Sequence, residues 1–136
     1  AAVDLFHVVD DPSNTPINKK ITAADVFNNV PSFLGLKQAS QTLTGSGGSG
    51  AVDILAAITE VNATSGTHAA TLADGADGQI KTIINTSTSG TNNVVITPSN
   101  LRGGTTITLN APGETVTCLF KNSNWNVIAF NGAVIA

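Results

Sequence analysis

The acidic side chains are the first candidates for chemistry, because two carboxylates that face each other across a sugar can hydrolyse a glycosidic bond. Asp53 and Glu60 are the pair to consider for this role. Their spacing, however, fixes neither a general acid nor a nucleophile. The sequence therefore predicts no catalytic residue and no enzyme, and a depolymerase fragment is the enzymatic alternative.

Two further patterns are candidates for metal binding. The segment Asp74-Gly75-Ala76-Asp77-Gly78 is similar to part of a calcium loop. It lacks the further acidic ligands and the closing Glu of an EF-hand, so a turn is the better interpretation. His7 and His68 lie in strand-like segments without a second His or Cys at metal-ligand spacing, which predicts packed or surface histidines. We expect no metal and no cofactor.

Cys118 is the single cysteine of the chain, so no internal disulfide can form. Neither histidine occurs in the sequence context of a cysteine hydrolase, and nothing indicates an activated thiolate. We predict that Cys118 is a small buried side chain in the alternating segment Glu114–Lys121. Trp125 should lie in the interior on the adjacent strand, after a turn at Asn122-Ser123-Asn124.

The segments that would position these residues are short and rich in β-branched side chains, which favours an all-β fold. Turn residues separate most of them at intervals of about 8–12 residues, as in a sandwich or barrel. We predict an antiparallel sandwich or barrel. The expected strands are Val3–Val9, Ala51–Ile54, Ala57–Asn62, His68–Leu72, Gln79–Asn85, Asn93–Thr97, Thr105–Asn110, Glu114–Lys121 and Trp125–Phe130.

Residues 1–37 differ from the rest of the chain. Thr22 and Asp25 have the spacing of a capping box ahead of Pro31, which predicts one short N-terminal helix of about two turns. Residues 38–136 should form the β-rich body, with Thr44–Gly50 as a flexible loop. We expect the N-terminal arm and helix (residues 1–37) and this body to make one compact unit overall.

Composition narrows the choice of partner. Charged residues make up 11% of the chain, about half the usual share in soluble domains, and the net charge of −3 is not concentrated at either end. Neither nucleic acid, nor a membrane, nor a small-molecule substrate is indicated. A surface of Asn, Thr, Ser and Gly favours a protein that lies against other protein or outside the cell, with an intracellular domain as the alternative.

The segment Trp125–Phe130 has apolar residues on both faces, whereas a half-buried antiparallel strand of a monomer usually has one polar face. In strict alternation, Ile128 and Phe130 lie on the face opposite Trp125. Another copy of the chain could cover this second face, or the strand could be central within one sandwich. We predict an oligomer, most simply a trimer.

Two segments resemble a known group of proteins. Residues 4–13, followed by Lys19-Lys20-Ile21-Thr22, resemble the opening of small structural proteins from tailed phages of aquatic bacteria. A later series is similar to a module of phage head-decoration and fibre proteins. This series consists of TLADG (71–75), GQIKTI (78–83), ITPSNL (96–101), GGTTIT (103–108), GETV (113–116), LFKN (119–122) and WNVI (125–128).

The resemblance implies a homotrimeric virion protein without catalytic residues, on the capsid exterior or in a fibre. The short length favours a decoration or cement protein on the outside of a tailed-phage head, which stabilises the shell. Its partners would be the major capsid protein and copies of itself, and its location the capsid surface of the virion. The alternative is a phage fibre or receptor-binding module that recognises a host-surface glycan or protein.

The N-terminal strand is a further candidate for docking. Its apolar cluster precedes a Pro-rich turn, and its backbone would stay unpaired unless it adds to a sheet edge. That edge could belong to the capsid, to a neighbouring copy or to the chain's own domain. The predicted capsid or subunit interface therefore comprises Leu5, Phe6, Val8, Val9, Ile128 and Phe130.

Overall fold

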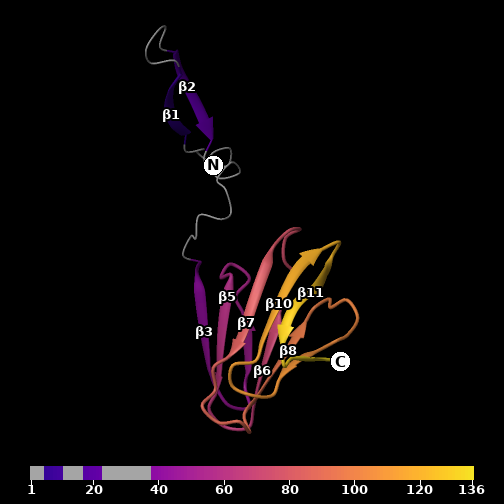
Figure 1. Cartoon of the computed structure of the whole chain (residues 1–136). Helices are drawn as coiled ribbons and strands as arrows, with labels where there is room; N and C mark the ends of the chain where they lie inside the picture. Colours follow the sequence, from indigo (N-terminus) through magenta and orange to yellow (C-terminus); the bar gives the residue numbers. More distant parts are fainter. Residues whose placement is uncertain (1–4, 11–16, 23–37) are drawn as a thin grey trace. The chain divides into compact units, whose positions relative to one another are not determined.

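The computed structural model describes residues 5–10, 17–22 and 38–136 (Figure 1). The chain divides into two compact units, Ala1–Lys37 and Gln38–Ala136, and each is described by itself. The helix predicted between Thr22 and Pro31 falls on residues outside the described ranges. Within those ranges the structure contains no helix, and hence none long and apolar enough to cross a membrane.

All regular elements of the described residues are strands, which confirms the all-β class. They are β1 (Leu5–Asp10), β2 (Ile17–Thr22), β3 (Ser40–Gly45), β4 (Ser49–Val52), β5 (Ile58–Ala63), β6 (Thr67–Leu72), β7 (Ile80–Asn85), β8 (Asn93–Pro98), β9 (Ile107–Leu109), β10 (Thr115–Lys121), β11 (Asn124–Asn131) and β12 (Val134–Ile135).

In the first unit, β1 and β2 form an antiparallel pair in which Phe6 lies opposite Ile21 and Val8 opposite Lys19. The sequence predicted the strand at β1 but no strand at β2. One edge of β1 is therefore paired within its own unit, which is one of the alternatives that the sequence left open. Whether Leu5, Phe6 and their neighbours on β1 form an interface stays a prediction.

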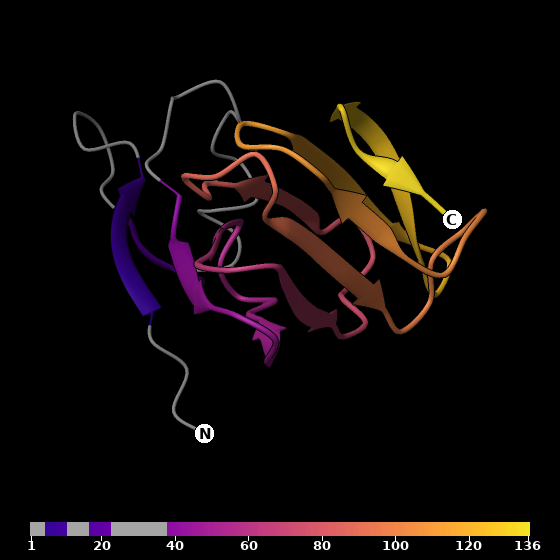
Figure 2. The same ribbon diagram turned by 90° about the horizontal axis from the view of Figure 1, so that it is seen from below.

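The second unit contains two five-stranded sheets. Sheet 1 has the order β11-β10-β7-β5-β3, and sheet 2 has the order β12-β9-β8-β6-β4. Strand β3, in magenta, and strand β11, in yellow, lie at opposite margins of sheet 1 (Figures 1 and 2).

Both sheets are mixed, so the predicted antiparallel architecture is wrong. The pairs β3–β5, β5–β7, β4–β6 and β6–β8 are parallel, whereas β10 is antiparallel to both β7 and β11. The reason is the path of the chain: from β3 to β8, successive strands alternate between the two sheets. A chain that crosses to the other sheet and returns enters the first sheet in its original direction, and a parallel neighbour results.

The core lies between the two sheets and follows the alternation of each strand. Strands β5 and β6 bury every second residue. Cys118 and Trp125 are fully buried on the adjacent strands β10 and β11, which confirms the prediction for both. The Trp125 ring packs edge-on against Phe120, with ring centroids 5.1 Å apart. Its Nε1 donates a hydrogen bond to the Ala73 carbonyl oxygen at 2.9 Å.

The turn between β10 and β11 is a two-residue hairpin loop. Lys121 pairs with Asn124, and the intervening Asn122 and Ser123 have φ angles of +53° and +59°. Positive φ at both central positions matches a type I′ turn, whose twist suits paired strands. The predicted turn is therefore confirmed, one residue shorter than expected.

The glycine-rich segment Thr44–Gly50 is not a free loop, in contrast to the prediction. Strand β3 extends to Gly45 and β4 begins at Ser49. The short connection between them is bound to β6, because the Gly47 amide donates to the Thr67 carbonyl at 2.8 Å and the Gly48 carbonyl accepts from the Ala69 amide at 3.2 Å. Composition predicted flexibility here, but backbone pairing orders the segment.

Candidate interaction surface

Strand β11 forms one margin of sheet 1 and carries two large apolar side chains that face water. Ile128 is 54% exposed and Phe130 is 60% exposed. Val134, which begins β12 after the next turn, is 50% exposed. Because β11 is an edge strand, the alternative that it is a central strand within one sandwich is wrong. We call Ile128 and Phe130 of sheet 1 and Val134 of sheet 2 the apolar strip, because they follow one another in the chain and not because they share one face.

A β-bulge changes which face each residue of β11 takes. Thr117 lies opposite Ala129 and Cys118 opposite Val127, so Ile128 is an extra residue without a cross-strand partner. Residues directly opposite each other share a face of the sheet. Phe130, opposite Val116, therefore lies on the inner face, at the open margin of the sandwich. The predicted alternation, which put Ile128 and Phe130 on one face, is wrong beyond Val127.

Strand β11 carries no Lys, Pro or charged side chain of its own; the protective features at its edge are the bulge at Ile128 and Arg102, whose Nε donates to Asn126 Oδ1 at 2.9 Å. Natural edge strands carry Lys, Pro or other charges that prevent pairing with another chain. The segment from Asn122 to Ala136 contains no charged side chain. At its start, the Trp125 backbone is bonded to Asn100 and Arg102, at 2.9 Å each. Beyond that point, the described part of the chain places no strand on the outer side of β11.

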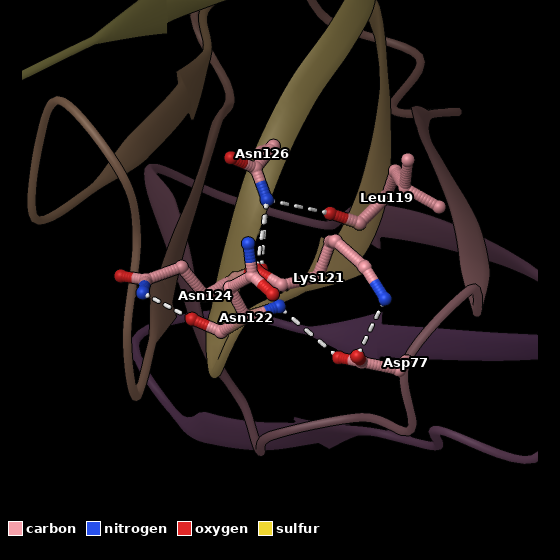
Figure 3. A network of polar contacts seen from close by, with 6 residues as sticks. All are labelled: Asp77, Leu119, Lys121, Asn122, Asn124 and Asn126. Carbon is pink, nitrogen blue, oxygen red and sulfur yellow. Dashed lines mark hydrogen bonds and ion pairs between the residues drawn. The ribbon is translucent and has the colours of Figure 1, made fainter.

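A polar network fixes the hairpin that carries β11 (Figure 3). Asp77 accepts hydrogen bonds from Lys121 Nζ at 2.7 Å and from the Asn122 amide at 3.1 Å. The hydrogen bond from Lys121 is the main cause that lowers the pKa of the Asp77 carboxyl. The Asn126 side-chain amide donates to the carbonyl oxygens of Leu119 and Asn124, at 3.2 Å and 2.9 Å. These contacts hold both strands of the hairpin in register.

The predicted candidates for chemistry occupy structural positions. Asp77 belongs to the connection between β6 and β7, whose turn was predicted, and its carboxylate binds the hairpin. The Asp53 carboxylate accepts a hydrogen bond from the Leu55 amide at 2.9 Å. Glu60 lies on β5, opposite Thr42 and Ile84. In the described residues there is no group of three or more His, Cys, Asp or Glu side chains that could hold a metal ion.

Lys81 is a buried residue that the sequence analysis missed. Its side chain is fully buried, and Nζ donates to the carbonyl oxygens of Asp53 and Ala56, at 2.9 Å and 2.5 Å. Removal from water lowers the pKa of Lys81 to about 8, against a weaker opposing effect of Asp53. The sequence did contain a signal, because in a strand Lys81 lies on the same face as the apolar residue Ile83. Ile80 and Ile84 make the opposite face of the strand apolar as well, so the sequence did not show which face is buried.

His68 is buried on β6, which confirms a packed histidine. Neither ring nitrogen has a hydrogen-bond partner among the described residues. Gly50 lies so close that an added Cβ would be 3.1 Å from His68 Nε2. His68 therefore occupies tight space beside the connection from β3 to β4.

A search of protein-family models finds no match to the chain, and a search of curated proteins finds none either. No pocket is found among the residues that the structure describes. The described residues do offer exposed apolar side chains for recognition.

Proposed function

We propose that this chain is a non-catalytic structural protein of a tailed-phage particle. It decorates the outside of the head, binds the major capsid protein and copies of itself as a homotrimer, and stabilises the shell. What supports this proposal is a set of exposed apolar side chains, Ile128, Phe130 and Val134, in a C-terminal segment without charged side chains. Covering such a strip with protein removes apolar area from water, at about 25 cal/mol per Å².

The composition of the outer faces of the two sheets also supports a role in which other proteins cover them. Outward positions of sheet 2 include Ala51, Ala69, Val95 and Thr108, and none of its outward positions is charged. On the outer face of sheet 1, the charged residues within strands are Glu60 and Lys121. Short neutral side chains lose less hydration than ions when a partner covers them. Such faces suit a broad contact made by shape and hydrogen bonding.

The N-terminal hairpin is the proposed anchor to the shell or to a neighbouring copy. A two-stranded hairpin is marginally stable by itself in water and gains stability when it adds to a larger sheet or packs on another surface. β1 and β2 pair with each other in a unit separate from the body. Any sheet edge of this pair that the described residues leave unpaired would then add to a strand of the partner.

The mechanical role is tested with particles that lack the chain. Heads assembled without it should release packaged DNA at a lower temperature than normal heads, and purified chain added back should restore the higher temperature. A Phe130→Ala chain, added back at the same concentration, is the matched control and should restore less. If heads with and without the chain release DNA at the same temperature, stabilisation of the shell is refuted.

A further inference from the structure

A buried histidine lies against the connection between β3 and β4, and we call residues 45–50 of this connection the strap. His68 is 5% exposed, and neither ring nitrogen has a hydrogen-bond partner in the part of the chain that the structure describes. A neutral imidazole has one N–H donor and one acceptor nitrogen, and burial of such groups without partners costs free energy. Because buried polar groups are nearly always hydrogen-bonded in folded proteins, this exception points to a role other than stabilisation.

The strap is bonded to the residues on either side of His68. The Gly47 amide donates to the Thr67 carbonyl oxygen at 2.8 Å. The Gly48 carbonyl oxygen accepts a hydrogen bond from the Ala69 amide at 3.2 Å. His68 lies between Thr67 and Ala69 on β6, so the place of its ring and the attachment of the strap are coupled.

The strap also fits closely against the His68 ring. A Cβ added at Gly50 would lie 3.1 Å from Nε2, and one added at Gly45 would lie 3.6 Å from Nδ1. The strands that flank the strap, β3 and β4, are edge strands, and each pairs with one neighbour among the described strands, β5 or β6. The strap and its strands can therefore separate from the body by breaking fewer backbone bonds than a central strand would have to break.

The described surroundings of His68 offer no counter-ion for a proton on its ring. Among the strands that lie around it (β3, β4, β5, β6 and β8), the charged side chain is Glu60 on β5. Glu60 lies on the outer face of sheet 1, because it alternates with the buried Thr59 and Val61. Asp53, which follows β4, is exposed, and the strap has no charged residue. A charged ring in the closed form would thus be a buried, unpaired cation, which costs more than a buried neutral group.

We propose that His68 is a pH-sensitive latch: the strap stays closed while the ring is neutral and opens when the ring takes up a proton. A solvated histidine binds a proton near pH 6.5, so below that pH the open form, in which water reaches the ring, binds more protons than the closed form. By linkage, the closed form loses stability as the pH falls. Opening leaves one side of β6 without a strand partner, and a strand of another protein can join such an edge. This inference does not depend on the proposed function.

The test is hydrogen–deuterium exchange of the full chain, followed by mass spectrometry between about pH 7 and 5 and corrected for the pH dependence of unprotected amides. Amides of the strap and of β4 should lose up to about tenfold in protection for each pH unit below about pH 6, as expected for one proton. Amides of β10 should keep their protection. His68→Leu and His68→Gln cannot take up the proton, so both should remove this pH dependence. His7→Gln, at the other histidine of the chain, is the matched control and should retain it.

Each outcome supports or overturns the latch. Strap protection that does not change with pH in the unaltered chain overturns it, and so does a pH dependence that persists in a His68 variant. Loss of the pH dependence in His7→Gln would assign the proton to His7 instead. Because the chain has two histidines, this control assigns the proton even if a His68 variant does not fold. If β10 loses protection in parallel with the strap, acid unfolds the whole body, and a local latch is overturned.

Discussion

The buried pair Lys81 and Cys118 leads to a prediction for stability as a function of pH. The two residues lie opposite each other on β7 and β10, and burial moves their titrations in opposite directions. The pKa of Lys81 falls from 10.5 to about 8, and the pKa of Cys118 rises from 9.0 to about 11. Each residue therefore exchanges its proton at a different pH in the folded and unfolded chain.

The sign of each contribution follows from which state binds more protons. Between about pH 8 and 10.5 the unfolded chain keeps a proton on Lys81 that the folded chain has released, so the free energy of unfolding rises with pH. Between about pH 9 and 11 the folded chain keeps a proton on Cys118 that the unfolded chain has released, so the free energy of unfolding falls. The Lys81 contribution is at most about 1.4 kcal/mol per pH unit.

The unaltered chain should therefore gain stability from pH 8 to 9 and then change little up to about pH 10.5. Cys118→Ala removes the opposing contribution, so its stability should keep rising, by about 3 kcal/mol in total at most. Lys81→Met is the matched control and should lack the rise. Urea unfolding followed by the fluorescence of the buried Trp125 measures all three chains. If Cys118→Ala shows no rise, or Lys81→Met shows the same rise, Lys81 is not buried in the way described.

Four further predictions follow from individual contacts. Trp125→Ala should lower the free energy of unfolding by about 3–5 kcal/mol, and a loss below about 1 kcal/mol would place the ring on the surface. Ser123→Gly should raise stability by about 0.4–1 kcal/mol because glycine tolerates the positive φ of this turn, and a loss of stability would contradict the turn geometry. The unaltered chain should have the light-scattering mass of several chains, and Phe130→Asp should reduce it to the mass of one. Leu55→Asp, a control at another exposed apolar residue, should leave the mass unchanged. An unaltered chain that is monomeric at micromolar concentrations refutes the oligomer. Deletion of residues 1–22 should abolish binding to heads and leave the circular dichroism of the body intact, and undiminished binding would exclude the hairpin as the anchor.

The sequence predicted most strands of the body, but it missed β3 and β12 and did not predict how the strands are arranged. Turn residues and period-two alternation mark where a strand such as β8 or β10 begins and ends, and they show which of its residues face the core. Neither signal predicts which strands are neighbours in a sheet. The order of the strands is what makes both sheets mixed. The glycine-rich composition around Gly47 concealed two strand ends, because the pairing that orders them comes from Thr67 and Ala69, far along the chain.

The candidate interface was predictable only in part, because the sequence does not show how strands pair. The uncharged apolar end of the chain is visible in the sequence, and Ile128 and Phe130 are exposed as an interface requires. Their faces could not be predicted, because a bulge at Ile128 is a property of the pairing between β10 and β11. Lys81 was missed because a lysine in a strand is ordinarily assigned to solvent, and its acceptors, the carbonyls of Asp53 and Ala56, come from a distant connection.

The location of the chain on the particle tests the central claim most directly. Electron cryomicroscopy of complete particles, compared with particles that lack the chain, would show where density is lost. Decoration predicts density at many equivalent positions over the capsid lattice, with the N-terminal hairpin at the contact with the shell. Density lost only from the tail or the vertices would contradict decoration and support a fibre or receptor-binding module instead.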